Sequence, residues 1–141
     1  MPTVRNSKKR DAIYTELCSR NDHPTVDELY RTIKDANPSL SMATVYRNLR
    51  QLCEEGKVNC IHGDTADRYD AHTEHHYHLL CTKCHRLFDL DIPEIPEIGK
   101  AIKGQFDGEV TSYSLLYTGL CKECAKSQKN ELKFNCGRQK L

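Results

Sequence analysis

The sequence lacks tryptophan, long apolar runs and an apolar leader. None of its apolar runs approaches the ~18 to 20 residues that a membrane-spanning helix requires. The first residues, MPTVRNSKKRD, do not contain the apolar core of a secretion signal. These absences predict a cytoplasmic protein.

The composition is that of an ordinary polar chain, with 38% apolar and 29% charged residues. A length of 141 residues suffices for one domain or two small ones, each with a thin core. In a reducing compartment the eight cysteines are not expected to form disulfides, so paired cysteines indicate metal ligands or redox groups. The net charge of +1 points to no partner. The acid-free basic segment from Arg5 to Arg10 suits a phosphate contact as well as it suits a solvated terminus.

Apolar periodicity predicts three helices in the first part of the chain. Residues 8–20 form the first; Thr25 and Glu28 make a capping box for the second; Ser41 caps the third, which Gly56 ends. The side chains expected to face the core are Ile13 and Leu17 with Tyr14 or Cys18, then Val26, Leu29, Tyr30 and Ile33, then Val45, Leu49 and Leu52.

Two short extended runs, KVNCIH and DRYDA, follow around Gly63 and predict a hairpin. Three helices and a hairpin are the order of a winged helix-turn-helix, in which the third helix enters the major groove of DNA. Thr44, Tyr46, Arg47 and Arg50 are then the candidate DNA contacts. The alternative is that they form the solvated face of an amphipathic helix.

The second part of the chain contains two CxxC pairs, each after an apolar strand. Two such turns can complete a tetrahedral zinc shell with no open position, so we expect a structural zinc site; a redox dithiol is the alternative. Cys18, Cys53 and Cys60 are expected to be small core residues, and Cys136 to be exposed. The predicted zinc ligands are Cys81, Cys84, Cys121 and Cys124.

These patterns predict an α+β protein with a winged-helix domain at 1–72, a small α/β metal-binding domain at 73–126 and a basic tail at 127–141. The expected hinge lies at 71–74. A helix should follow the two prolines of PEIPEIGKAIKGQF, and residues 109–121 should form a half-buried strand. The tail from Ala125 onward is expected to be a frayed helix or disordered.

The stretch HHYHLLCTKCHRLFD contains a second set of metal ligands. His76 and His78 alternate on a strand, so both imidazoles face one side, and Asp89 lies on the paired strand. Nitrogen with carboxylate suits Fe(II), Mn(II) and Zn(II). A polar surface strand is the alternative.

Taken together, ATVYRNL, RYD, HHYHLLCTKC, LFD and GLCKEC resemble the ferric uptake regulator family of bacterial metal-sensing repressors over residues 4–126. The resemblance implies a homodimeric DNA-binding repressor, not an enzyme, with a roughly palindromic operator. It makes residues 73–126 the dimerisation and metal-binding domain. It also implies a regulatory Fe(II) or Mn(II) site that takes ligands from both domains. The implied ligands are His23, Asp70, His76, His78 and Asp89.

Three histidines and two aspartates resemble the peroxide-sensing branch, in which iron-catalysed oxidation of a ligand imidazole releases the repressor from DNA. The matching oxidation-sensitive residues are His23 and His76, and five ligands leave an octahedral ion one open position. An iron-responsive repressor without peroxide sensing is the alternative, and Arg47 resembles that branch.

Two departures from the family pattern also carry expectations. A further metal site found in some members would need an acid and a histidine where this chain has Tyr77 and Leu120, so none is expected. His62, His72, His75 and His85 are then hinge or surface residues. The chain begins near the second helix of typical members, without the helix that usually precedes the DNA-binding unit. DNA affinity is then expected to be weaker, unless the basic segment from Arg5 to Arg10 substitutes for that helix.

Two other function classes fit part of the pattern. A metal-dependent hydrolase or oxygenase could use three histidines and two aspartates, but the sequence offers no additional general base. A constitutive DNA-binding or zinc-storage protein would bind DNA independently of added metal.

Overall fold

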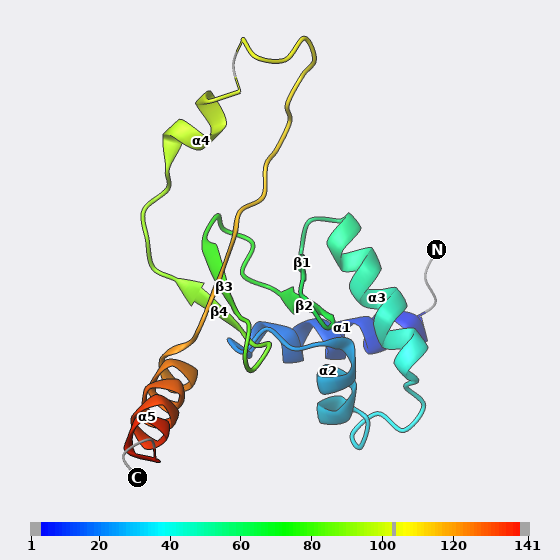
Figure 1. Cartoon of the computed structure of the whole chain (residues 1–141). Helices are drawn as coiled ribbons and strands as arrows, with labels where there is room; N and C mark the ends of the chain where they lie inside the picture. The colour runs from blue at the N-terminus through cyan, green and yellow to red at the C-terminus, as the bar shows by residue number, and fades with distance from the viewer. Residues whose placement is uncertain (1–3, 103, 139–141) are drawn as a thin grey trace. The chain divides into compact units, whose positions relative to one another are not determined.

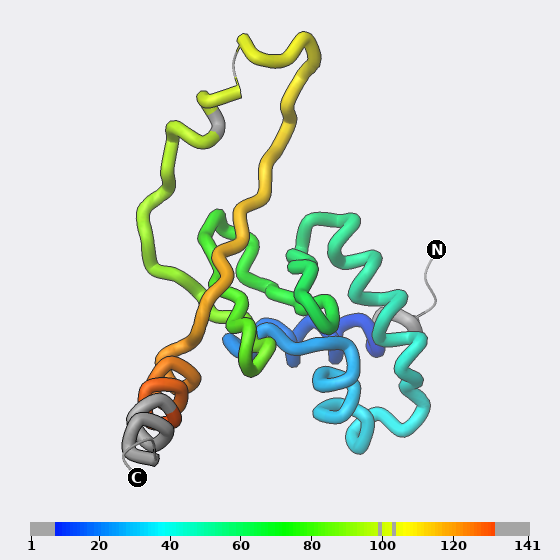
Figure 2. The backbone as a smooth tube through the Cα atoms, in the orientation of Figure 1, coloured from blue at the N-terminus to red at the C-terminus, as the bar shows by residue number. Residues whose placement is uncertain are grey.

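The computed structural model of the protein describes residues 4–102 and 104–138 (Figures 1 and 2). The chain divides into two compact units. The first comprises Met1–Glu74 with His85–Leu87, and the second comprises His75–Cys84 with Phe88–Leu141. None of the helices in the described ranges is both long and apolar enough to cross a membrane.

The first unit is built on three helices, α1 (Val4–Cys18), α2 (Val26–Ile33) and α3 (Met42–Glu54). The apolar stripes predicted from periodicity form its core, which confirms the three-helix prediction. The first helix contributes Tyr14 as a partly buried neighbour of the core, whereas Cys18 is exposed. The expectation that Cys18 is a core residue was therefore wrong. The buried core cluster consists of Ile13, Leu17, Leu29, Ile33, Leu40, Val45, Leu49, Leu52, Val58 and Tyr69.

The helix ends follow the local signals in the sequence. Thr25 and Glu28 form the reciprocal capping box at the start of α2. Ser41 accepts a hydrogen bond from the backbone N–H of Thr44 at the start of α3. After α3, Gly56 has a φ of 71°, and the N–H of Lys57 donates to the carbonyl of Leu52, as in a Schellman motif.

A hairpin of β1 (Asn59–His62) and β2 (Asp67–Asp70) follows the helices. The strands are antiparallel, with Asn59 opposite Asp70 and His62 opposite Asp67. The order of three helices and a hairpin is that of a winged helix-turn-helix, as predicted. Cys53 and Cys60 are partly buried against the core, as expected.

The second unit contains a three-stranded sheet with the order β4-β3-β5. Its strands are β3 (Tyr77–Cys81), β4 (Leu87–Leu90) and β5 (Leu116–Gly119). β3 and β5 are parallel neighbours. A short helix, α4 (Pro96–Lys100), begins at the second proline between β4 and β5, and α5 (Lys122–Arg138) follows β5. The residues after Ala125, expected to be frayed or disordered, continue α5 as far as the described chain extends.

The segment between β4 and β5 leaves the sheet and returns to it as a long excursion (Figure 2). Residues 109–115, predicted to be strand, are not strand, and only Leu116–Gly119 pairs with β3. In residues 109–115 apolar and polar side chains alternate, but the backbone lacks the neighbouring strand that a β-strand requires for its hydrogen bonds. Within the described ranges, no other strand supplies those hydrogen bonds.

Candidate metal centres

Two CxxC turns bring four thiols together in the second unit. Cys81 ends β3 with Cys84 in the turn after it, while Cys121 and Cys124 lie where β5 leads into α5. Because β3 and β5 are parallel, with Cys81 opposite Gly119, both turns leave the sheet at the same edge. The four sulfur atoms lie within 4.8 Å of one another, and those of Cys84 and Cys121 are 4.0 Å apart.

This geometry and charge distribution fit a closed zinc site. Zn–S bonds of about 2.3 Å place the sulfurs of a tetrahedral shell about 3.8 Å apart. Burial opposes ionisation of Cys81, but backbone N–H groups around it lower the pKa of its thiol to about 6. Burial and neighbouring thiols raise the pKa of Cys124 to about 12. Four thiolates this close together would repel one another, and a divalent cation between them neutralises that repulsion. The four residues therefore suit zinc.

Two histidines and one carboxylate converge on one face of the second unit. His76 directly precedes β3 and His78 lies in it, so the two rings share a side of the strand, with their centroids 4.4 Å apart. Asp89 on β4 lies close to both rings: its Oδ1 is 3.1 Å from His76 Nε2 and 3.2 Å from His78 Nε2. His78 is buried, whereas Asp89 is about half exposed.

A second pair, His23 and Asp70, lies buried in the first unit. His23 Nε2 is 3.5 Å from Asp70 Oδ2, and the side chains are 2% and 3% exposed. Asp70 ends β2, and its Oδ1 accepts a hydrogen bond of 2.8 Å from the backbone N–H of His72. The imidazole and carboxylate of this pair are the same kinds of donor as those in the second unit, and such nitrogen and oxygen donors suit Fe(II) and Mn(II).

Arg68 positions the loop that carries His23, a role that sequence reasoning missed. Its Nη1 donates to the carbonyl of His23 at 2.9 Å and lies 3.3 Å from Glu28 Oε2, and its Nε donates to the carbonyl of His85 at 3.1 Å. His23 has a φ of 51°, a left-handed conformation that is costly for a non-glycine residue and needs such support. Arg68 and its neighbours Tyr69 and Asp70 are all buried, so no alternation marked this arginine as inward-facing.

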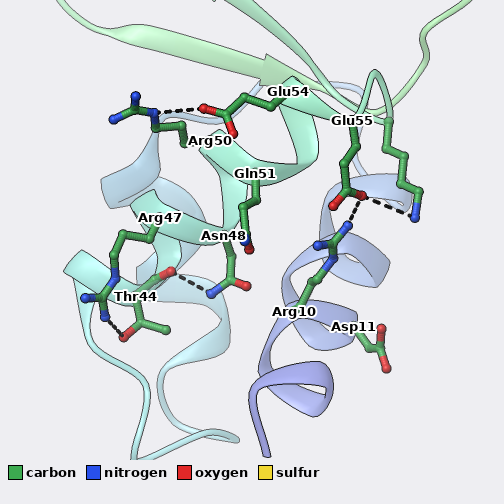
Figure 3. Close-up of a pocket in the computed structure, with 10 residues that line it drawn as sticks. Arg10, Asp11, Thr44, Arg47, Asn48, Arg50, Gln51, Glu54 and Glu55 are labelled. Atoms are coloured by element: carbon green, nitrogen blue, oxygen red, sulfur yellow. Dashed lines mark hydrogen bonds and ion pairs between the residues drawn. The ribbon is translucent and has the colours of Figure 1, made fainter. Parts of the chain in front are cut away.

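The candidate DNA-contacting residues lie on the outward face of α3. Figure 3 shows part of this face, where α3 and α1 line a groove of about 1010 Å³. Arg47 donates to the Thr44 hydroxyl at 3.3 Å, and Arg50 pairs with Glu54 at 3.2 Å. Tyr46 is 51% exposed although it is large and apolar.

Across the groove, Arg10 of α1 is paired with Glu55 (Figure 3). This ion pair raises the pKa of Arg10 and lowers that of the Glu55 carboxyl, chiefly through the hydrogen bond between them. Arg10 therefore joins α1 to the end of α3. In the basic segment, which suited either a phosphate contact or a solvated terminus, Arg10 and Lys9 already make contacts within the protein.

Comparison with known proteins agrees with this architecture. The sequence model described as the ferric uptake regulator family matches residues 2–118. The peroxide-responsive repressor of Staphylococcus epidermidis is 37% identical over 122 residues, which cover 86% of this chain and 81% of that repressor. The Staphylococcus aureus repressor of the same name matches equally well and is covered to 82%.

Two solved structures share the fold. The Campylobacter jejuni peroxide stress regulator aligns with a TM-score of 0.72 at 34% identity, over 86% of this chain and 92% of that one. The ferric uptake regulator of Francisella tularensis with iron aligns with a TM-score of 0.71 at 26% identity, over 89% and 95% of the two chains. The chain belongs to the ferric uptake regulator family.

Proposed function

We propose that this protein is a dimeric repressor that binds DNA when its regulatory metal is present and releases it after peroxide oxidises that site. As a member of the ferric uptake regulator family it is a DNA-binding regulator and not an enzyme. The observation that carries the proposal is the donor set of three histidines and two aspartates, which contains neither glutamate nor thiol. The peroxide-responsive relatives support the same reading.

The regulatory ion would be held by ligands from both units. His23 and Asp70 are the ligands from the first unit. His76, His78 and Asp89 are those from the second. One ion bound by both units restricts the angle between them, and that angle sets the spacing of the two recognition helices in a dimer. Metal and DNA then favour the same state, and each strengthens the binding of the other.

His23 and His76 are the proposed targets of oxidation. Peroxide is the oxidant: one of its oxygen atoms is added to a ring carbon and the other leaves as water. Bound Fe(II) would supply the redox chemistry that activates peroxide beside these rings. An oxidised imidazole is a poorer ligand, so His23 and His76 would no longer hold the two units together. Mn(II) fits the same donors, and a protein loaded with Mn(II) should bind DNA but resist peroxide.

We further propose that α3 is the recognition helix and that Thr44, Tyr46, Arg47 and Arg50 contact DNA. The support is their outward position on α3, together with the order of the helices and hairpin. A symmetric dimer presents two such helices, which favours a roughly palindromic operator with half-sites one helical turn apart, ~34 Å. Such a repressor acts in the cytoplasm, where bacterial DNA is located.

The test is an anaerobic operator-binding titration with Fe(II) and Mn(II) separately, followed by peroxide. We expect both metals to promote binding and only the Fe(II) sample to lose it, with added oxygen on peptides that carry His23 or His76. His76→Ala should remove the response to metal, whereas the exposed His75→Ala should retain it. Release from DNA without oxygen on either histidine would contradict the mechanism, and binding unaffected by peroxide would favour the iron-responsive alternative.

The same titration tests the DNA-contacting face. Arg47→Ala should weaken operator binding by about 1–3 kcal/mol at every metal concentration. The control is Arg31→Ala on α2, which removes an exposed cation paired with Asp27 one turn away. Equal effects of the two substitutions would contradict the assignment of α3 as the recognition helix.

A further inference from the structure

The hairpin of β1 and β2, the wing of the first unit, brings together three potential metal ligands: the partly buried Cys60 and the exposed His62 and Asp67. Cys60 and His62 are two residues apart on β1, so their side chains point to the same face. Asp67 begins β2 directly opposite His62. This arrangement lies wholly within the first unit and is distinct from the four-cysteine and histidine–aspartate sets described above.

The potential donor atoms of the three side chains lie nearly as close together as the ligands of one metal ion. The Cys60 sulfur, one ring nitrogen of His62 and one carboxylate oxygen of Asp67 lie within 4.8 Å of one another. His62 Nδ1 and Asp67 Oδ1 are 2.9 Å apart, and the Cys60 thiol also hydrogen-bonds to Asp67. In a tetrahedral zinc shell such donors are separated by about 3.4–3.6 Å. His62 and Asp67 have the exposed side chains whose rotation would adjust these separations.

We propose that Cys60, His62 and Asp67 form an additional, exchangeable zinc site in the wing. One thiolate, one imidazole and one carboxylate match the borderline character of Zn(II), whereas Mn(II) and Mg(II) prefer oxygen donors. The His62 side chain is 83% exposed and that of Asp67 is 44% exposed, so an ion can reach them from solvent and keep water as its fourth ligand.

The chemistry of Cys60 makes this site weaker than the four-cysteine site. Burial, together with the charge of Asp67, raises the pKa of the Cys60 thiol to about 11. A metal must therefore displace the thiol proton and also break the contact between His62 and Asp67. A bound ion would join β1 to β2 across the hairpin and stiffen the wing. The alternative to a zinc site is a surface histidine–aspartate ion pair beside a partly buried cysteine.

The experiment is a Co(II) titration of the full-length protein with zinc already bound at its four cysteines. Co(II) bound to a thiolate has an intense sulfur-to-metal absorption, which the proposed regulatory ligands, having no sulfur, cannot produce. We expect this absorption to saturate at one Co(II) per protomer and to be abolished by added Zn(II). Zinc content is measured before and after the titration, to show whether Co(II) has entered the four-cysteine site.

Matched variants identify the ligands. Cys60→Ser and His62→Ala should each lose the absorption and bind one Co(II) fewer per protomer, while Cys18→Ser, which removes an exposed thiol elsewhere, should behave as the unsubstituted protein. His62 is exposed, so its replacement should leave the fold intact. Absence of the absorption in the unsubstituted protein, or its survival in Cys60→Ser or His62→Ala, overturns the proposal. Because the readout depends on Cys60, it does not depend on whether the histidine–aspartate site senses peroxide.

Discussion

Arg68 connects three segments of the first unit through its guanidinium. It is buried and makes contacts with the carbonyls of His23 and His85 and with the carboxylate of Glu28. Glu28 also accepts a hydrogen bond from the backbone N–H of Thr25 in the capping box of α2. The start of α2, the His23 loop and β2 are thus connected through one guanidinium.

Replacing Arg68 should therefore affect both stability and metal binding. Because hydrogen bonds from a charged donor contribute about 1.5–3 kcal/mol each, we expect Arg68→Ala to lower the free energy of unfolding by at least about 2 kcal/mol. The proposed regulatory site should lose roughly 10–100-fold in Mn(II) affinity, as when a supporting residue of a metal ligand is removed. Denaturant unfolding without Mn(II) and calorimetric Mn(II) titration measure the two effects.

Arg31→Ala is the control for Arg68→Ala. Arg31 pairs with Asp27 on the surface of α2, and exposed pairs of this kind contribute at most about 0.5 kcal/mol. Unchanged Mn(II) affinity in a folded Arg68→Ala protein would show that Arg68 does not position His23.

At the scale of elements, the two cysteine turns stabilise a sheet that has little else to hold it. β3 and β5 pair over four residue positions. The large buried cluster belongs to the first unit, whereas the described part of the second buries few apolar side chains, chiefly Tyr77 and Leu80. Such a thin core requires additional stabilisation, which a metal between the turns can provide.

Removing one thiol should release the zinc and loosen β3 from β5. In Cys84→Ser we expect loss of one zinc per protomer and faster hydrogen exchange at the amides of Leu79 and Leu80, while the amides of α3 remain protected. Structural zinc contributes about 10 kcal/mol or more to folding, so the effect should be large. Metal analysis and hydrogen-exchange mass spectrometry measure it, with Cys18→Ser as the control. Full zinc content in Cys84→Ser would refute the four-cysteine assignment.

At the scale of the whole molecule, the segment between β4 and β5 contains most of the exposed large apolar side chains of the described residues. Of the seven exposed large apolar side chains recorded in the described residues, five lie between β4 and β5. Exposed apolar side chains concentrated on one segment are typical of an interaction surface, and the family is dimeric. The unpaired residues 109–115 would gain backbone partners if a second copy packed there. The five side chains are Ile92, Ile102, Phe106, Val110 and Tyr113.

Phe106→Ser should therefore weaken the dimer. Burial of a phenylalanine contributes about 1.5–3 kcal/mol, and a two-fold dimer loses it twice, so we expect dissociation to become easier by roughly 100-fold or more. Sedimentation equilibrium measures the change. Gln105→Ser, at the neighbouring exposed position, should leave the equilibrium unchanged. A Phe106→Ser protein that dimerises as tightly as the parent would place the interface elsewhere.

The sequence alone determined what depends on neighbours along the chain. Helical periodicity predicted the buried face of α3, and the cap residues Thr25 and Ser41 predicted where helices begin. The spacing of each cysteine pair predicted which thiols could converge on one ion. These features are local, because a helix turn, a cap or a CxxC turn is set by residues only a few positions apart.

Only the tertiary structure decided what depends on residues far apart in the chain. It paired His23 with Asp70 and buried Arg68 against the His23 loop and the α2 cap. It also left residues 109–115 outside the sheet despite their alternating pattern. The physical reason is that a strand requires a backbone partner and a buried charge requires its own partners, and neither requirement is written in the local sequence.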